Sequence, residues 1–123
     1  MKQLKPTIEE QIEAIVHHKA YELVMNYSGV DRVDKQSYEQ VFTVKRSEIL
    51  AYIRNKYDLN DLIPRRSDIR DGFYAIPVSD GYRIYEQYDG HRTPPEDVAG
   101  KDILQEKYVD YLLRSSGTGL NFE

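Results

Sequence analysis

The chain of 123 residues contains no cysteine and no tryptophan, and it has no long uninterrupted apolar segment. The absence of cysteine excludes disulfide frameworks, thiol catalysis and metal sites built on thiolates. Charged residues interrupt the apolar residues of the N-terminal segment MKQLKPTIEEQIEAIV, which therefore lacks the apolar core of a signal peptide or a membrane span. We expect a cytoplasmic protein that does not enter a membrane.

What is present fits a single soluble domain. The hydrophobic share of 40% and the charged share of 31% are ordinary for a globular protein, and the length is sufficient for a core without disulfides or metal. We expect residues 1–123 to form one domain with a loose tail at 118–123. The formal charge of −4 argues against a general nucleic-acid binder and favours a basic partner. Eleven tyrosines suggest that some of them lie at a contact surface.

Hydrophobic periodicity predicts three helices. Apolar residues recur at steps of three and four over residues 7–26, 46–57 and 103–114. Thr7 and Glu10 have the spacing of a capping box at the start of the first helix, and Gly117 is the expected stop of the last. Residues 38–44 fit either a short strand or the approach to the next helix. Residues 58–71, which contain a proline and charges of both signs, are expected to form a surface connection.

Residues 73–88 predict a β-hairpin, followed by a charged segment that leads toward a helix. The fold class is therefore α+β, with about three helices packed on a small antiparallel sheet built around this hairpin. A three-residue loop, 79–81, would pair Val78 with Tyr82 and Ile76 with Ile84, which gathers the aliphatic residues on one inward face. A two-residue loop at 80–81 mixes polar and apolar residues on both faces and is the poorer solution. The favoured register leaves Arg83, Tyr85 and Gln87 on the opposite, outward face, as a candidate contact surface.

Residues suited to catalysis or metal binding are few. The three histidines are His17, His18 and His91. His18 and Glu22 share a helix face at a spacing that could begin a metal site, but no third ligand follows from the spacing. We therefore expect no enzymatic activity, no metal and no cofactor.

Two charge patterns suggest different partners. A basic cluster in the middle of the chain, together with helices and a hairpin, permits a winged-helix interpretation, although carboxylates interrupt it. Its members are Lys45, Arg46, Arg54, Lys56, Arg65, Arg66 and Arg70. Asp102, Glu106 and Asp110 follow one another at steps of four and predict an acidic stripe on the last helix. An acidic stripe can steer association with a basic protein surface.

The segment GFYAIPVSDGYRIYEQYDGHR, a short linker and KDILQEKYVDYLL together resemble small bacterial immunity proteins of polymorphic-toxin and contact-dependent inhibition systems. The shared pattern is an aromatic hairpin, a polar exit containing glycine, and a helix that ends in paired leucines. It covers the C-terminal third of the chain. The matching positions are Phe73, Tyr74, Asp80, Gly81, Tyr85, Asp89, Gly90, Arg92, Tyr111, Leu112 and Leu113.

The resemblance implies a non-enzymatic inhibitor that binds a cognate toxin, with a basic nuclease domain as the expected partner, and occludes its active site. The net negative charge and the interrupted apolar residues of the N-terminus lead us to expect neither nucleic-acid nor membrane binding. The residues expected to contact the partner are Arg83, Tyr85, Gln87, Asp89, Asp102, Glu106 and Asp110. The alternatives are a winged-helix-like DNA-binding regulator and an accessory protein of a phage or mobile element.

Overall fold

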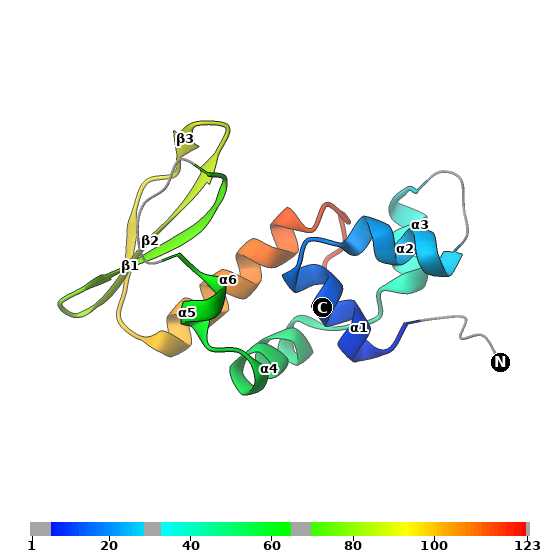
Figure 1. Cartoon of the computed structure of the whole chain (residues 1–123), viewed down its shortest axis with the longest axis horizontal. Helices are drawn as coiled ribbons and strands as arrows, with labels where there is room; N and C mark the ends of the chain where they lie inside the picture. The colour runs from blue at the N-terminus through cyan, green and yellow to red at the C-terminus, as the bar shows by residue number, and fades with distance from the viewer. Residues whose placement is uncertain (1–5, 29–32, 65–69, 123) are drawn as a thin grey trace. The chain divides into compact units, whose positions relative to one another are not determined.

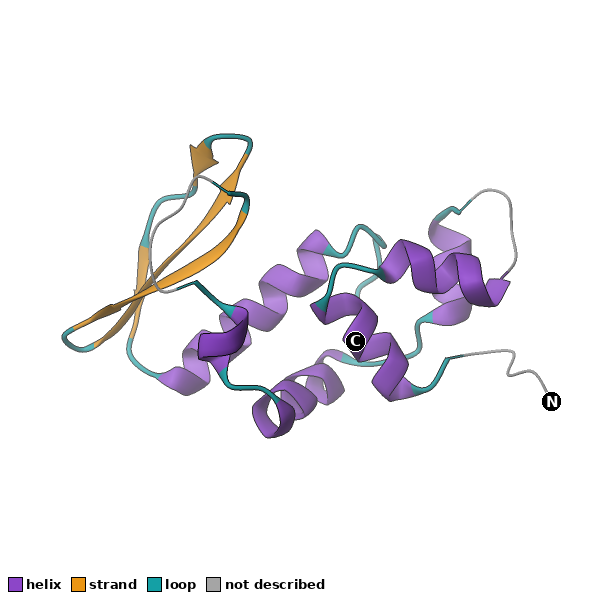
Figure 2. Cartoon of the chain, viewed as in Figure 1, coloured by secondary structure: helices purple, strands orange, loops and turns teal. Residues whose placement is uncertain are grey.

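The computed structural model of the chain describes residues 6–28, 33–64 and 70–122. Within them it forms six helices and a small four-stranded antiparallel sheet (Figure 2). The predicted α+β class is confirmed, but the expected count of about three helices is wrong. The chain divides into two compact units, the first of residues 1–51 and 109–123 and the second of residues 52–108.

The first predicted helix is two helices, α1 (Ile8–Val16) and α2 (Ala20–Ser28) (Figure 1). The capping box at the start of α1 is confirmed, because Thr7 Oγ1 accepts from the Glu10 N–H and Glu10 Oε1 accepts from the Thr7 N–H, each at 3.1 Å. The break follows at His18, whose φ is 57°. The His18 N–H bonds to the carbonyl of Ile15 and the Lys19 N–H to that of Ala14. These two bonds form a Schellman motif, in which glycine usually occupies the position of His18.

Residues 38–44 are the end of a helix and an extended segment. Helix α3 (Lys35–Val41) begins at Asp34, whose Oδ1 accepts from the Ser37 N–H at 2.9 Å and thereby caps the helix. The extended residues after it are held by Gln11, a buried side chain of α1 that is 2% exposed. Gln11 Oε1 accepts from the N–H groups of Thr43 and Val44 at 2.8 and 2.9 Å. The side-chain amide of Gln11 therefore satisfies two adjacent backbone N–H groups that have no partner in a β-strand.

The C-terminal residues also contribute to the first unit. Thr118 and Phe122, in the segment expected to be loose, are both buried. The Phe122 carbonyl accepts from the Arg46 N–H at 2.7 Å, and its ring lies edge-on to Phe42 at a centroid distance of 6.2 Å. Arg46 is the first residue of α4, so the C-terminal segment satisfies one of the free donors at that helix start.

Helices α4 (Arg46–Lys56) and α6 (Lys101–Ser115) contain residues of both units. Both lie close to their predicted ranges. Ile49 and Ile53 of α4 are buried as expected, and so is Leu104 of α6. Ile103, one of the periodic apolar residues of the last predicted helix, is 42% exposed.

The second unit contains α5 (Leu59–Leu62) and the four strands, β1 (Gly72–Val78), β2 (Gly81–Tyr88), β3 (His91–Arg92) and β4 (Glu96–Val98). Strand β2 is central. Strand β1 pairs with it over its whole length, and β3 and β4 share its other side (Figure 1). The charged segment and short linker expected between the hairpin and the last helix contain β3 and β4.

The predicted hairpin register is wrong. Val78 pairs with Gly81, so the loop contains two residues, Ser79 and Asp80, and Tyr74 lies opposite Tyr85. The two tyrosine rings stack at 5.1 Å with an interplanar angle of 11°. Gly81 is required in this register, because a Cβ atom there would lie 2.0 Å from the carbonyl oxygen of Val98 on β4.

The middle of the sheet is buried on both faces. Phe73, Tyr74 and Ala75 are consecutive in β1, and each is at most 5% exposed. Because side chains alternate between faces along a strand, three consecutive buried residues need cover on both sides. Phe73 packs edge-on to Tyr108 of α6 at 5.6 Å. The prediction of one inward and one outward face fails for this reason.

Prolines occupy both edges of the sheet. The Ala75 N–H points away from β2, toward the carbonyl of Pro64 at 3.5 Å. Because backbone groups alternate in direction along a strand, the nitrogen of Pro77, two residues on, also faces the outer edge of β1. On the other edge, Pro94 and Pro95 separate β3 from β4. Thr93 bridges this gap, since its N–H donates to the Glu86 carbonyl and its Oγ1 accepts from the Glu86 N–H, both at 2.9 Å.

Candidate functional site

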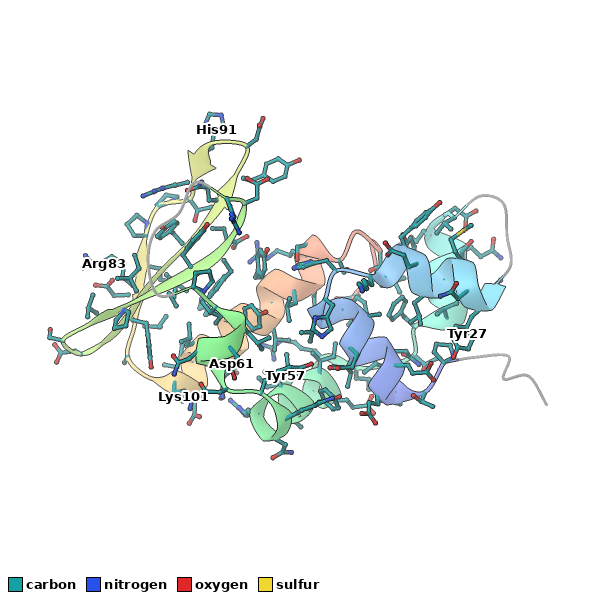
Figure 3. The ribbon with its side chains drawn as sticks, viewed as in Figure 1. Tyr27, Tyr57, Asp61, Arg83, His91 and Lys101 are labelled. Atoms are coloured by element: carbon teal, nitrogen blue, oxygen red, sulfur yellow. The ribbon has the colours of Figure 1, made fainter. Side chains whose placement is uncertain are left out.

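The tip of the β2–β3 hairpin, residues 88–91, carries the most exposed large apolar side chain among the described residues. Tyr88 is 77% exposed and is paired with His91 across the turn. Asp89 and Gly90 form the turn with φ values of 49° and 80°. Positive φ at both central positions is the geometry of a type I′ turn, for which an Asp-Gly pair is favoured. Figure 3 shows His91 at this end of the sheet.

Contacts of the turn and of the base of the hairpin hold the tip in place. The Asp89 N–H donates to Asp71 Oδ1 at 2.9 Å, which ties the turn to the segment before β1. Arg92 Nε donates to Gln87 Oε1 at 3.0 Å, and its guanidinium lies 5.0 Å from the centre of the Tyr85 ring. The tip therefore presents Tyr88 on a structured support, which lowers the entropy lost when a partner binds.

The four sequence-predicted contact residues of the hairpin lie in different environments. Tyr85 and Gln87 are 7% and 6% exposed, so the prediction that they lie on an open face is wrong. Their burial follows from the stack of Tyr85 on Tyr74 and from the cover provided by Arg92. Arg83 and Asp89 are exposed, Asp89 at the hairpin tip and Arg83 nearer the other end of β2.

Arg83 forms an ion pair with its cross-strand neighbour Asp97. Arg83 Nε lies 2.9 Å from Asp97 Oδ1, and Arg83 Nη2 lies 3.2 Å from Asp97 Oδ2. These hydrogen bonds lower the pKa of the Asp97 carboxyl and raise the pKa of the guanidinium. Both side chains are more than half exposed, so water screens the attraction and the pair contributes little to folding.

The predicted acidic stripe on α6 is not a row of free carboxylates. Asp110 Oδ1 accepts from Arg46 Nε at 2.8 Å, inside the first unit. Asp102 and Glu106 belong to the second unit, where Asp102 is exposed and Glu106 is half-buried. The Asp102 backbone carbonyl accepts from Arg54 Nη2 at 3.4 Å. Asp102 is the most accessible residue of the predicted stripe.

Three described members of the predicted basic cluster, Arg46, Arg54 and Lys56, contact other residues of the chain through their charged groups. Arg46 is paired with Asp110, and Arg54 Nε donates to Gln105 at 3.0 Å. Lys56 Nζ donates to the Tyr52 hydroxyl at 2.8 Å. Arg65 and Arg66 lie outside the described residues. Arg46, Arg54 and Lys56 would have to leave their present partners in order to contact the phosphates of a nucleic acid.

His17 and His18 each lie close to another side chain of the first unit. His17 lies 3.9 Å from Glu13 Oε1, and the His18 ring is edge-on to Tyr111 at 6.3 Å. Within residues 6–28, 33–64 and 70–122, no group of three acidic or histidine side chains is placed to hold a metal ion. The role of the histidines stays a prediction.

Sequence reasoning missed Tyr88 and His91 as neighbours at an exposed tip. The available signal was the dipeptide Asp89-Gly90 between Tyr88 and His91, which is typical of a two-residue hairpin turn. The sequence pattern predicts a polar exit toward a helix at this segment instead. Asp71 was missed as well, because its contact with the turn joins residues 18 positions apart.

The chain matches no family model, and no curated protein or solved structure is significantly similar to it. None of the helices in the described residues has the length and apolar character needed to cross a membrane.

Proposed function

We propose that this protein is a non-enzymatic immunity protein that neutralises a basic bacterial toxin, most favourably a nuclease domain, by occluding its active site. The observation that supports this most is the exposure of Tyr88 on the structured β2–β3 tip. Tyrosine supplies a large, rigid and amphipathic contact area, and such residues anchor protein interfaces. A partner that covered Tyr88 would remove the largest solvent-exposed aromatic surface among the described residues.

The charge of the whole chain suits a basic partner. Asp71 and Asp89 are exposed close to Tyr88, as are Arg70 and Arg92, and the chain as a whole has a formal charge of −4. A nuclease that holds phosphates needs a basic substrate groove, and an acidic inhibitor is attracted to that groove from a distance. The resemblance to immunity proteins rests on the same hairpin and polar exit.

The winged-helix alternative has less support. The helix before the hairpin, α5, has four residues, which is too short to lie along a major groove. Arg46, Arg54 and Lys56 have intramolecular partners. A DNA-binding regulator would bind random duplex DNA at micromolar concentration with a steep salt dependence, whereas the inhibitor is expected to show no appreciable binding at physiological salt.

The decisive experiment pairs Tyr88→Ala with a control, Tyr21→Ala. Tyr21 is also an exposed tyrosine, at 54%, but lies on α2 in the first unit. Each variant is co-expressed in bacteria with the toxin domain encoded by the adjacent gene, and survival and affinity are measured. Tyr88→Ala is expected to weaken binding by about 2 kcal/mol, roughly thirty-fold, and to reduce protection. Tyr21→Ala should protect like the wild type.

Three results would contradict this proposal. The first is an adjacent gene that encodes no toxin, and the second is a wild-type protein that fails to bind or neutralise that toxin. The third is equal protection by both variants, which would remove the tip from the interface. Circular dichroism of Tyr88→Ala establishes that any loss does not come from unfolding, since an exposed side chain contributes little to stability.

A further inference from the structure

A surface groove lies at the opposite end of β2 from the Tyr88 tip. It has a volume of about 300 Å³ and is formed by the β1–β2 turn, the start of β2 and the end of β4. Its apolar lining comes from Val78, Val98 and Ala99, of which Val78 is half-buried. The volume is at the lower limit of small-ligand pockets. A groove of this size suits one side chain of a partner better than a cofactor.

The groove has a net negative charge, which comes from a single carboxylate. Arg83 and Asp97 line it and neutralise each other through two hydrogen bonds. Asp80 also lines it, and within the described part of the chain its carboxylate has no hydrogen-bond or ion-pair partner. The groove therefore has one uncompensated carboxylate beside an apolar surface. Each oxygen of the Asp97 carboxylate also keeps a lone pair that Arg83 does not use.

We propose that this groove binds an arginine side chain of the partner protein, an inference that rests on the proposed inhibitor function and extends it. The aliphatic stem of the arginine packs on Val78 and Val98, and the guanidinium forms paired hydrogen bonds with Asp80. Arginine is favoured over lysine because its planar fork matches a carboxylate and can lie against the guanidinium and carboxylate of the Arg83–Asp97 pair. A basic nuclease presents such side chains around its substrate groove.

The test uses the isolated protein with a small probe, N-acetyl-arginine methylamide, and its uncharged isostere, N-acetyl-citrulline methylamide, as the matched control ligand. Both are titrated to tens of millimolar while backbone amide shifts are followed by NMR. The arginine compound is expected to shift the amides of Ser79, Asp80 and Ala99, and the citrulline compound is expected to shift them much less. Asp80→Asn should weaken the arginine response about five-fold, because it removes a charged acceptor.

Asp61→Asn is the matched control variant. Asp61 is an exposed carboxylate of the same unit, but it lies on α5 and away from the groove lining (Figure 3). It should leave the arginine response unchanged. Equal responses to both probes, an unaffected Asp80→Asn, or equal losses in both variants would each overturn the proposal. A failure here leaves the toxin-protection result for Tyr88→Ala standing, so the two proposals can fail separately. Asp80 is exposed in a turn, and the NMR spectrum of the variant reports directly whether it is folded.

Discussion

Replacing Gln11 with methionine should destabilise the first unit far more than the change in size suggests. Methionine has a similar length and a good helix propensity, so α1 and its packing are largely retained. The hydrogen bonds are lost. Gln11 accepts from two backbone N–H groups at 2.8 and 2.9 Å and donates to the Pro6 carbonyl and to Thr43 Oγ1, both at 3.2 Å.

The magnitude follows from which partners water can reach. Val44 is 3% exposed, so its N–H would be left buried without an acceptor, which costs about 1 to 3 kcal/mol. Thr43 is exposed, so water can replace part of what its N–H and hydroxyl lose. The Pro6 carbonyl, in a buried residue, loses a donor as well. We expect a total loss of about 2 to 4 kcal/mol in the free energy of unfolding.

The measurement is urea denaturation followed by circular dichroism, together with hydrogen exchange of the Val44 amide. Gln40→Met is the control, because Gln40 is exposed on α3 and the same change there should cost less than about 0.5 kcal/mol. Faster exchange at Val44 in Gln11→Met alone would locate the loss at this contact. A difference of less than about 0.5 kcal/mol between the two variants would refute the reasoning.

Three further changes test the sheet and the α1–α2 contact. Gly81→Ala should lower the melting temperature much more than Gly90→Ala, because a Cβ atom at Gly81 meets the β4 backbone while Gly90, with φ of 80°, has open space around it; similar losses would contradict the close approach. Tyr85→Ala should lower the free energy of unfolding, measured by urea denaturation, by about 3 to 5 kcal/mol. A loss below about 1 kcal/mol would indicate that the Tyr85 ring lies on an open face. The hydrogen bond from the Tyr27 hydroxyl at 2.6 Å lowers the pKa of Glu10 from its usual 4.5. A carboxyl pKa that is lowered in the folded state stabilises the fold above pH 4.5, and this stabilisation is lost as the pH falls through the folded-state pKa. Tyr27→Phe should therefore weaken the fall of melting temperature between pH 7 and pH 3. An unchanged dependence of melting temperature on pH would show that the Tyr27 hydroxyl has no such role.

Local signals predicted the local structure well. The Thr7 and Glu10 capping box, the ranges of α4 and α6, and the presence of a hairpin before α6 all follow from short-range chemistry that the sequence displays directly. The break between α1 and α2 was not predictable in this way, because His18 occupies a left-handed position where the sequence has no glycine. The stabilising bonds from the His18 N–H to Ile15 and from the Lys19 N–H to Ala14 appear only in the three-dimensional structure.

The candidate site could be predicted only in part, because burial on a sheet depends on what covers each face. The alternation of side chains along β2 correctly places Ile84 and Tyr85 on opposite faces of the sheet. It cannot tell that both faces are covered, which requires the stack on Tyr74 and the guanidinium of Arg92. Tyr88 escapes this cover because it lies at the last position of β2, beside the turn.

The prolines at the two sheet edges limit the ways in which another protein can bind to the sheet. Pro77 has no N–H to offer a neighbouring strand, the Ala75 N–H is directed to Pro64, and Pro94 and Pro95 interrupt the other edge. A partner therefore gains little from adding a strand, a mode in which affinity comes from backbone hydrogen bonds that any sequence can make. In the proposed inhibitor, partner contacts would therefore come mainly from side chains, and single substitutions at the exposed tip would change specificity while the sheet beneath it stays the same.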